Sequence, residues 1–236
     1  MNKKEFLARL AELDLPKDEF RVLSGGSLLL HGLRERTNDI DLAISQELAD
    51  ELQIQNYPCK NGYIYTFAPD VEMMIDAGRS TYDEVCGCTC EDLQSILAFK
   101  RKMMREKDLP DIAKIEEYLE GRRFLELERR LFKVKYMTDA QYLDKTLADD
   151  YLECGKSGRL FGKAEVIEEL TALTKDRPIE IFNYSAEKMG EVWLVHYVTL
   201  NGNDRIYRTS IWTDDGVMKF HQASKLTIDI ELEEAK

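Results

Sequence analysis

Two aspartates alternate with aliphatic residues in the segment DIDLAIS, where Ile40 separates Asp39 from Asp41. On a β-strand this alternation places both carboxylates on one face and the aliphatic side chains on the other. Two carboxylates on one face repel each other unless a cation lies between them. The pair therefore predicts a site for Mg²⁺, which takes one or two carboxylates and completes its coordination with water and phosphate oxygens.

A glycine-serine segment precedes the acidic pair. Gly25 and Gly26 predict a turn whose backbone, without Cβ atoms, can approach a phosphate closely. Ser27 predicts the cap of a short helix, SLLLHGL, whose N-terminus favours anions. Together the two segments favour chemistry on a triphosphate, because two metal ions can clamp the attacking and leaving oxygens of a phosphoryl displacement.

The elements that must position these residues are predicted from hydrophobic periodicity and from capping residues. The helix after the strands carries Glu91 and Asp92 in its first turn, as the helix dipole favours. The predicted elements around the acidic pair are helices over 3–13, 46–53, 90–107, 109–121 and 122–135, and strands FRVLS, DIDLAIS, GYIYTFA and VEMMIDA.

The segment SGGSLLLHGLRERTNDIDLAI resembles the nucleotidyltransferases of the DNA polymerase beta superfamily, in the minimal bacterial and toxin-type branch that includes AbiEii-like proteins. The resemblance covers about residues 20–120 and implies a mixed sheet with helices, bound Mg²⁺, and transfer of a nucleoside monophosphate from a nucleoside triphosphate. The matching positions are Gly25, Gly26, Ser27, Arg34, Thr37, Asp39 and Asp41, and, in a later helix pair, Lys100, Arg105, Lys107, Asp108 and Asp111.

The same resemblance implies a third carboxylate on a neighbouring strand. VEMMID offers Glu72 and Asp76, and Glu72 is favoured because VEMM occupies the position of the family's acid-hydrophobic pair. Asp76 is the alternative. The predicted catalytic and metal-binding residues are Asp39, Asp41 and Glu72, and the predicted nucleotide-binding residues are Gly25, Gly26, Ser27, Arg34, Thr37 and Lys100.

The pattern changes near Met137, so the chain is predicted to be α+β with two domains, 1–136 and 137–236. TDAQYLDKTLADDYLECG and KAEVIEELTALT predict helices, and PIEIFNYSA begins a run of four strands. The turns NGND and TDDG join the last three strands as antiparallel hairpins. The C-terminal segment ELEEAK is predicted to be frayed.

The second domain resembles the SnoaL-like domains of the nuclear-transport-factor-2-like superfamily, through LADDYLECGKSGRLFGKAEVIEEL, RTSIW and KFHQASKL. The resemblance implies a cone-shaped α+β barrel, with helices over a curved antiparallel sheet, an open pocket, and a homodimer in some members. Because His221 and Gln222 are adjacent on a strand, only one of them is expected to enter the pocket. The candidate pocket residues are Glu153, Ser157, Arg208, Ser210, Trp212, His221 and Gln222.

The net charge of −12 and the pI near 4.9 argue against attraction of the whole surface to nucleic acid or an anionic membrane. The sequence shows no apolar signal segment and no apolar run long enough to span a bilayer. An odd number of cysteines, five, favours reduced thiols and a cytoplasmic location. In CGCTC, buried thiols are favoured over a metal site, and His31 is read as packing or C-capping its helix.

The predicted function is Mg²⁺-dependent transfer of a nucleoside monophosphate from a nucleoside triphosphate to an unidentified hydroxyl. An RNA or protein acceptor would suit a toxin-like role, although the net charge does not indicate RNA. A small hydroxylated molecule is the other acceptor considered. The alternative is an inactive nucleotidyltransferase fold in a protein that binds a small molecule, or forms dimers, through its C-terminal domain.

Overall fold

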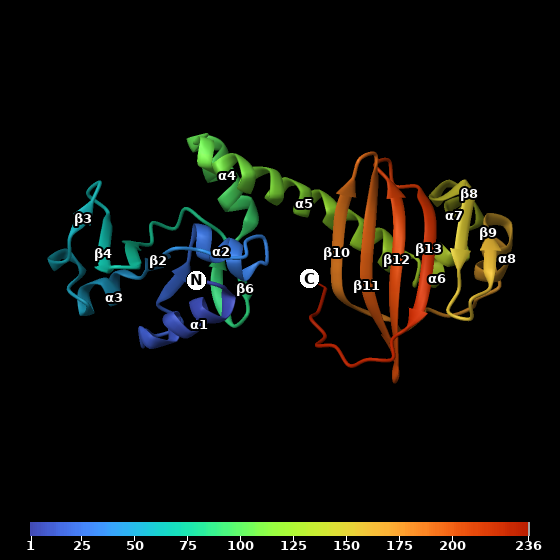
Figure 1. Cartoon of the computed structure of the whole chain (residues 1–236), viewed down its shortest axis with the longest axis horizontal. Coiled ribbons are helices and arrows are strands. Elements are labelled where there is room, and N and C mark those ends of the chain that lie inside the picture. The colour runs from blue at the N-terminus through green and yellow to red at the C-terminus, as the bar shows by residue number, and fades with distance from the viewer. Residues whose placement is uncertain (236) are drawn as a thin grey trace. The chain divides into compact units, whose positions relative to one another are not determined.

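The computed structural model describes residues 1–235, except for the side chain of Asn201, and it divides into two compact units, Met1–Glu116 (unit 1) and Glu117–Lys236 (unit 2). Each unit combines helices with one β-sheet, so the predicted α+β class is confirmed (Figure 1). Over the described residues, none of the helices has both the length and the apolar character needed to cross a lipid bilayer.

Unit 1 is built around a seven-stranded mixed sheet of order β3-β4-β5-β2-β1-β7-β6. The strand β2 lies antiparallel to β1 and parallel to β5. The elements of unit 1 are α1 (Lys3–Glu12), β1 (Phe20–Val22), α2 (Ser24–Leu30), β2 (Ile40–Ile44), α3 (Gln46–Glu51), the 3-10 helix η1 (Ile54–Asn56), β3 (Cys59–Lys60), β4 (Ile64–Ala68), β5 (Val71–Ile75), β6 (Tyr82–Val85), β7 (Cys88–Glu91), α4 (Leu93–Met103), η2 (Glu106–Asp108) and the beginning of α5 (Leu109–Arg130).

The first residues of the strand β2 alternate in burial as the sequence predicts, whereas Leu42, Ala43 and Ile44 are all buried. Ile40 and Leu42 are fully buried in the core of unit 1, whereas Asp41 is half-buried and Asp39, just before the strand, is exposed. The aliphatic side chains anchor the strand and leave the carboxylates on the opposite face. The predicted helices over 46–53 and 109–121 and the strands FRVLS, GYIYTFA and VEMMIDA also have counterparts in the structure.

The glycine-serine segment differs from its prediction. Gly25 and Gly26 lie in the first turn of α2, not in a turn before it, and Ser27 is a buried residue inside the helix. Its hydroxyl donates to the main-chain oxygen of Glu91 at 2.6 Å, so Ser27 is not the N-cap residue that the sequence predicted. A Cβ on Gly26 would lie 2.7 Å from Cζ of Phe6, so the missing side chain permits close packing of α1 on α2.

Residues 82–91 form a hairpin that the sequence analysis did not predict. Cys86 and Gly87 join β6 to β7, and both have positive φ, as the two central residues of a type I′ turn require. Glu91 is therefore the last residue of β7 and not part of a helix. Asp92 caps α4, its carboxylate accepting from the backbone N–H of Ser95.

The helix α5 is continuous through Gly121, so the predicted break between two helices at that residue is wrong. A Cβ on Gly121 would lie 3.0 Å from Cβ of Ala186, which places the glycine where the helix approaches β10. The structural division falls within α5, before the composition change near Met137, because Phe124 and Leu125 of the same helix belong to the core of unit 2.

Unit 2 contains a six-stranded sheet of order β10-β11-β12-β13-β8-β9, antiparallel except where β13 meets β8 (Figure 1). Register shifts interrupt β10, β12 and β13, and such bulges increase the twist and bend of a sheet. Its remaining elements are α6 (Val134–Met137), α7 (Ala140–Thr146), β8 (Leu147–Cys154), β9 (Leu160–Gly162), α8 (Lys163–Thr171), β10 (Glu180–Met189), β11 (Val192–Asn201), β12 (Asp204–Thr213) and β13 (Met218–Lys225).

Two predictions for unit 2 are corrected by the structure. The predicted helix TDAQYLDKTLADDYLECG ends at Thr146, and its second half is the strand β8, whose hydrogen-bonded neighbours β13 and β9 override its local helical pattern. The tail is not frayed over residues 233–235, because the backbone N–H groups of Asn183 and Ala235 donate to Glu233 and Ile181. The tail thus pairs with the edge strand β10, while Lys236 lies outside the described residues.

Candidate functional site

The acidic residues of unit 1 meet across two neighbouring strands. Asp41 on β2 lies directly opposite Glu72 on the parallel strand β5, and Asp39 precedes Asp41 by two residues. The backbone oxygen of Asp41 accepts from the N–H of Leu23 at 2.9 Å, which holds the beginning of α2 beside the acids. Thr37, buried, donates to the backbone oxygen of Asp39 at 3.3 Å.

The electrostatics of this group centre on Asp41. Burial, followed by the negative charges of Asp39, Glu72 and Glu91, raises the pKa of Asp41 to about 6. Lys107, an exposed residue of η2, acts in the opposite direction. When Asp39 and Asp41 are both ionised, their carboxylates repel each other. A cation bound between them would reduce this repulsion.

The carboxylates around Asp41 offer few ligands to a Mg²⁺ ion. Among residues 1–235, no three His, Cys, Asp or Glu side chains are arranged to hold a metal ion. Glu72 instead accepts a hydrogen bond from the ammonium group of Lys60, which supplies a positive charge beside it. Asp39 and Asp41 remain as two carboxylates, a set that suits Mg²⁺ when phosphate oxygens and water complete its coordination. The residues therefore fit a metal ion that arrives with a nucleotide.

Three of the predicted nucleotide-binding residues are brought together by the fold. Arg34 forms a two-pronged ion pair with Asp111, through Nε at 3.0 Å and Nη2 at 2.6 Å. A Cβ on Gly25 would lie 2.9 Å from Nη1 of Arg34 and 3.1 Å from Oγ1 of Thr37. Gly25, Arg34 and Thr37 therefore surround one point at the beginning of α2.

Lys100 lies elsewhere than its prediction requires. Its ammonium group is buried and forms ion pairs with Asp108 at 3.0 Å and Asp111 at 2.8 Å. Arg105 also bonds Asp108, and this bond, then Lys100, holds the pKa of Asp108 at about 2 against the effect of burial. Lys100 thus neutralises two buried carboxylates and is not available to a triphosphate. Two exposed lysines, Lys107 and Lys60, interact electrostatically with Asp41.

Two residues near the acidic pair were missed by sequence reasoning, Lys60 and Glu91. The carboxylate of Glu91 accepts from the N–H of Ser24 at 3.1 Å and from the hydroxyl of Ser80 at 2.8 Å. The alternation CGCTCE, which makes Glu91 a strand residue, is the signal that could have placed it. Nothing local marks Lys60, because it meets Glu72 only through the pairing of β3, β4 and β5.

The alternative third carboxylate, Asp76, has other partners. It follows the last residue of β5 and accepts from the hydroxyl of Tyr82 at 2.9 Å and from the N–H of Gly78 at 2.8 Å. Glu72 is the residue paired with Asp41 in register.

The cysteines and His31 lie outside this group of acids. Cys90 is buried and its thiol pKa is raised to about 12 by burial, whereas Cys59 and Cys86 are exposed. The prediction of buried thiols therefore fails for Cys86, because it occupies the hairpin turn. His31 is the C-terminal cap residue of α2.

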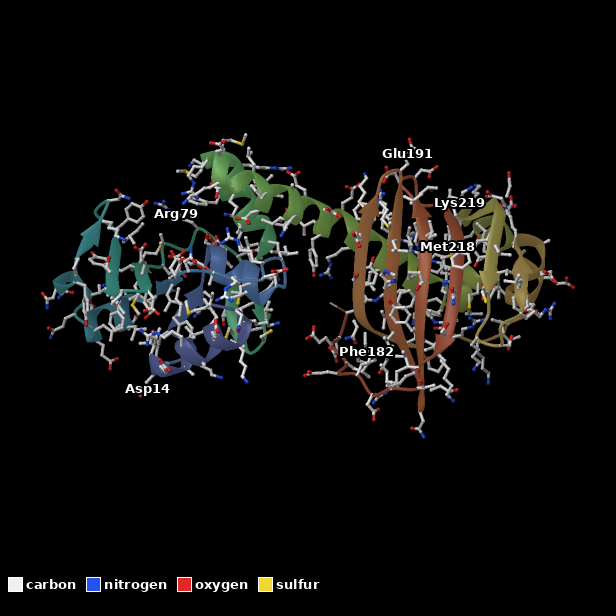
Figure 2. All side chains as sticks on the ribbon, viewed as in Figure 1. Asp14, Arg79, Phe182, Glu191, Met218 and Lys219 are labelled. Atoms are coloured by element: carbon white, nitrogen blue, oxygen red, sulfur yellow. The ribbon has the colours of Figure 1, made fainter. Side chains whose placement is uncertain are left out.

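Unit 2 contains a cavity of about 480 Å³ between its sheet and the helices α5 and α8. Met218, which Figure 2 labels on β13, is one of its lining residues, while the next residue, Lys219, pairs with Asp150 at 2.6 Å. The charged and polar side chains that line the cavity are Glu128, Tyr151, Glu153, Lys156, Ser157, Glu169, Arg177, Tyr197, Thr199, Asp204, Arg208 and His221.

The predicted pocket residues divide between the cavity and the core. Glu153, Ser157, Arg208 and His221 line the cavity, and Gln222 is exposed. Trp212 and Ser210 are fully buried and do not line it. Trp212 is instead part of the core, its ring centroid 5.8 Å from that of Phe124.

A buried hydrogen-bond network supports the cavity wall. Glu128 of α5 accepts from Tyr197 Oη at 2.5 Å and Trp212 Nε1 at 2.9 Å, and Ser210 is a third donor. His221 lies 2.9 Å from Ser210 through Nδ1 and 3.1 Å from Nη1 of Arg208 through Nε2. Sequence reasoning missed Glu128, Tyr197 and Arg177, because these residues meet only when α5 lies against the sheet.

No protein-family model matches the chain, and no curated protein matches it. Solved structures match part of it. The chain is similar to an NTF2-like protein from Cytophaga hutchinsonii (16% identity, TM-score 0.38), over 44% of this chain and 95% of that protein.

Two further similar structures are also NTF2-like proteins, both described as being of unknown function. The protein from Rhodospirillum rubrum is 24% identical, with a TM-score of 0.34 over 42% of this chain and 94% of its own. The protein from Pseudomonas aeruginosa is 17% identical, with a TM-score of 0.34 over 45% of this chain and 98% of its own.

Proposed function

We propose that unit 1 is a nucleotidyltransferase that moves a nucleoside monophosphate from a nucleoside triphosphate with Mg²⁺ to a hydroxyl acceptor. The observation that supports this most is the register of β2 and β5, which sets Asp41 opposite Glu72 with Asp39 alongside. The raised pKa of Asp41 is a second support, because burial and then the neighbouring carboxylates disfavour its ionised form, which a bound cation would stabilise.

The roles follow from the positions of the side chains. Asp39 and Asp41 would hold the Mg²⁺ that accompanies the triphosphate, and a bound ion would supply positive charge beside the phosphates. Arg34 and Thr37, beside Gly25, bind phosphate oxygens, and Lys107 adds a positive charge on the side of Asp41. Resemblance to the superfamily implies that one carboxylate accepts the proton of the attacking hydroxyl.

Titration calorimetry with each of the four nucleoside triphosphates tests the proposal. Mg²⁺-dependent binding of at least one nucleotide to the wild-type protein is expected, with binding lost in Asp41→Asn. Asp83→Asn, which changes an exposed carboxylate of β6, is the matched control and should bind as the wild type does. Binding that persists in EDTA, or in Asp41→Asn, would contradict the proposed site.

A second candidate function is favoured by one observation. Lys60 forms an ion pair with Glu72 and so neutralises this carboxylate without a metal ion. Such a pair is expected in a domain that keeps the nucleotidyltransferase fold but has no metal-dependent activity. The protein would then act through unit 2, as a small-molecule-binding or dimerisation module. Transfer of label from α-³²P nucleotides to RNA, protein or a small alcohol would exclude this alternative, whereas binding without transfer to any of them would favour it.

A further inference from the structure

The cavity of unit 2 contains two guanidinium groups without a carboxylate partner. Arg208 on β12 donates through Nε to Thr199 Oγ1 at 3.0 Å and through Nη1 to His221 Nε2 at 3.1 Å, and both acceptors are uncharged. Its guanidinium also lies over the ring of Phe132, 5.4 Å from the centroid. Within the described part of the chain, no salt bridge includes Arg208.

Arg177 is the second cation, on the segment between α8 and β10. Its backbone N–H donates to Phe132 O at 2.9 Å, which fixes the residue beside the same aromatic ring. Among the described residues, no hydrogen bond or salt bridge uses its guanidinium group, although the side chain lines the cavity. Burial, followed by the like charge of Arg208, lowers the pKa of Arg177, and the negative charges of Glu153 and Glu169 oppose this shift without reversing it. The two cations therefore face one space and repel each other.

Among the described residues, neither Glu128 nor the imidazole of His221 forms a salt bridge with Arg177 or Arg208. Because an arginine nitrogen can only donate, His221 Nε2 must accept from Arg208, and the imidazole is neutral with its proton on Nδ1. That proton is directed at Ser210 Oγ, whose own hydrogen is directed at Glu128. Glu128 also accepts from Tyr197 and Trp212, so it is committed to the core.

The rest of the lining is largely apolar, and the volume suits a small organic molecule. Side chains from α5, α8 and the five strands β8, β9, β11, β12 and β13 enclose the space around the two arginines. Besides Glu128, three acids line the cavity: Glu153, which accepts from Tyr151 Oη at 3.0 Å, Glu169 of α8, and Asp204, which pairs with Lys225 at 2.8 Å. The apolar lining residues are Leu131, Phe132, Leu147, Phe161, Val166, Leu170, Ile179, Ile206, Met218 and Ala223.

We propose that this cavity binds a small monocarboxylate with an apolar body, whose carboxylate is held by Arg177 and Arg208. A carboxylate between the two guanidiniums replaces their repulsion with charge-assisted hydrogen bonds. The apolar body replaces water along the aliphatic and aromatic wall. Glu153 and Glu169 disfavour a second negative charge, so the site selects monoanions over dianions. This site is separate from the proposed nucleotide site and belongs to unit 2 alone.

Three matched probes test the proposal on the full chain by titration calorimetry at neutral pH. They are 3-phenylpropionate, its neutral amide 3-phenylpropionamide, and the dianion phenylsuccinate. The carboxylate is expected to bind at least about tenfold more tightly than the amide or the dianion. Arg177→Met is expected to weaken its binding about tenfold or more without unfolding the protein, because the guanidinium makes no hydrogen bond that folding needs.

Arg208→Met is the second variant, with near-ultraviolet circular dichroism as the check on its fold. Arg205→Met is the matched control, because Arg205 lies on the same strand and pairs with Asp229 on the surface. It is expected to bind the carboxylate as the wild type does. Equal affinity for carboxylate and amide, unchanged binding in Arg177→Met, or no binding of the carboxylate to the wild-type protein would each overturn the proposal. None of these outcomes depends on the nucleotide site.

Discussion

Asp41 carries an electrostatic cost that can be measured as a pH dependence of stability. Its pKa is raised from 3.8 to about 6 in the folded protein, so the folded state binds a proton more tightly than the unfolded chain. The stability that this proton contributes is present below pH 4 and is lost as the pH rises through about 6. We expect Asp41→Asn to raise the free energy of unfolding by about 2 kcal/mol at pH 7.5 and by little at pH 4.

Urea unfolding followed by far-ultraviolet circular dichroism at the two pH values measures this difference. Asp83→Asn should change the stability little at both, because Asp83 is exposed and Asp41 is not. An Asp41→Asn variant less stable than the wild type at pH 7.5 would show that Asp41 holds the native structure together. The expected result would also establish that loss of nucleotide binding in this variant is not caused by unfolding.

The sequence predicted residues whose neighbours are local and missed those whose partners come from distant elements. The strand alternation around Asp39 and Asp41 follows from adjacent residues, and the structure places both as that alternation requires. Lys60 and Glu91 approach the same acids through β3 and β7. The alternation CGCTCE could have placed Glu91 on a strand, but no local pattern marks Lys60. Lys100 was predicted to contact the nucleotide because Lys100, Asp108 and Asp111 match a family motif. The same three residues also suit a buried ion pair, which is what the structure shows.

At the scale of elements, the two adjacent glycines of α2 serve different purposes. A Cβ on Gly26 would overlap the buried ring of Phe6 and lie 2.9 Å from Cγ1 of Val22. A Cβ on Gly25 would meet only the end of the Arg34 side chain and the hydroxyl of Thr37, and the arginine can shift. Gly26→Ala is therefore expected to destabilise the protein by about 1–2 kcal/mol, since overpacking outweighs the better helix propensity of alanine.

Gly25→Ala is the paired comparison, and urea unfolding of both variants is the measurement. We expect Gly25→Ala to cost less stability than Gly26→Ala but to weaken nucleotide binding, because it displaces Arg34 and fills the space beside Thr37. If the two alanines were equally destabilising, the packing of α1 on α2 would not explain Gly26.

The elements that sequence reasoning misassigned were decided by tertiary packing. Residues 147–154 have a helical pattern, but as β8 they lie between β13 and β9, where the backbone finds its hydrogen bonds. Gly121 was read as the end of a helix, whereas it permits α5 to approach Ala186 and Trp193. Both errors came from treating a segment as if its own residues fixed its structure.

At the scale of the whole molecule, the two units have separate hydrophobic cores with no residue in common. The only two tryptophans, Trp193 and Trp212, are both in the core of unit 2. Tryptophan fluorescence therefore reports on unit 2, whereas circular dichroism reports on both units. Comparing the two signals therefore separates the unfolding of unit 1 from the unfolding of unit 2.

Lys100→Met is a substitution in unit 1 whose effect the two spectroscopic probes should report differently. The substitution leaves Asp111 with Arg34 and Asp108 with Arg105 but removes the charge buried between the two acids, so we expect unit 1 to lose about 3–5 kcal/mol. The circular dichroism transition should then begin at lower urea while the fluorescence transition keeps its wild-type midpoint. Arg101→Met, which removes the exposed ion pair with Glu116, should leave both transitions in place. Transitions that shift together in Lys100→Met would mean that the two cores unfold as one cooperative structure through the shared helix α5.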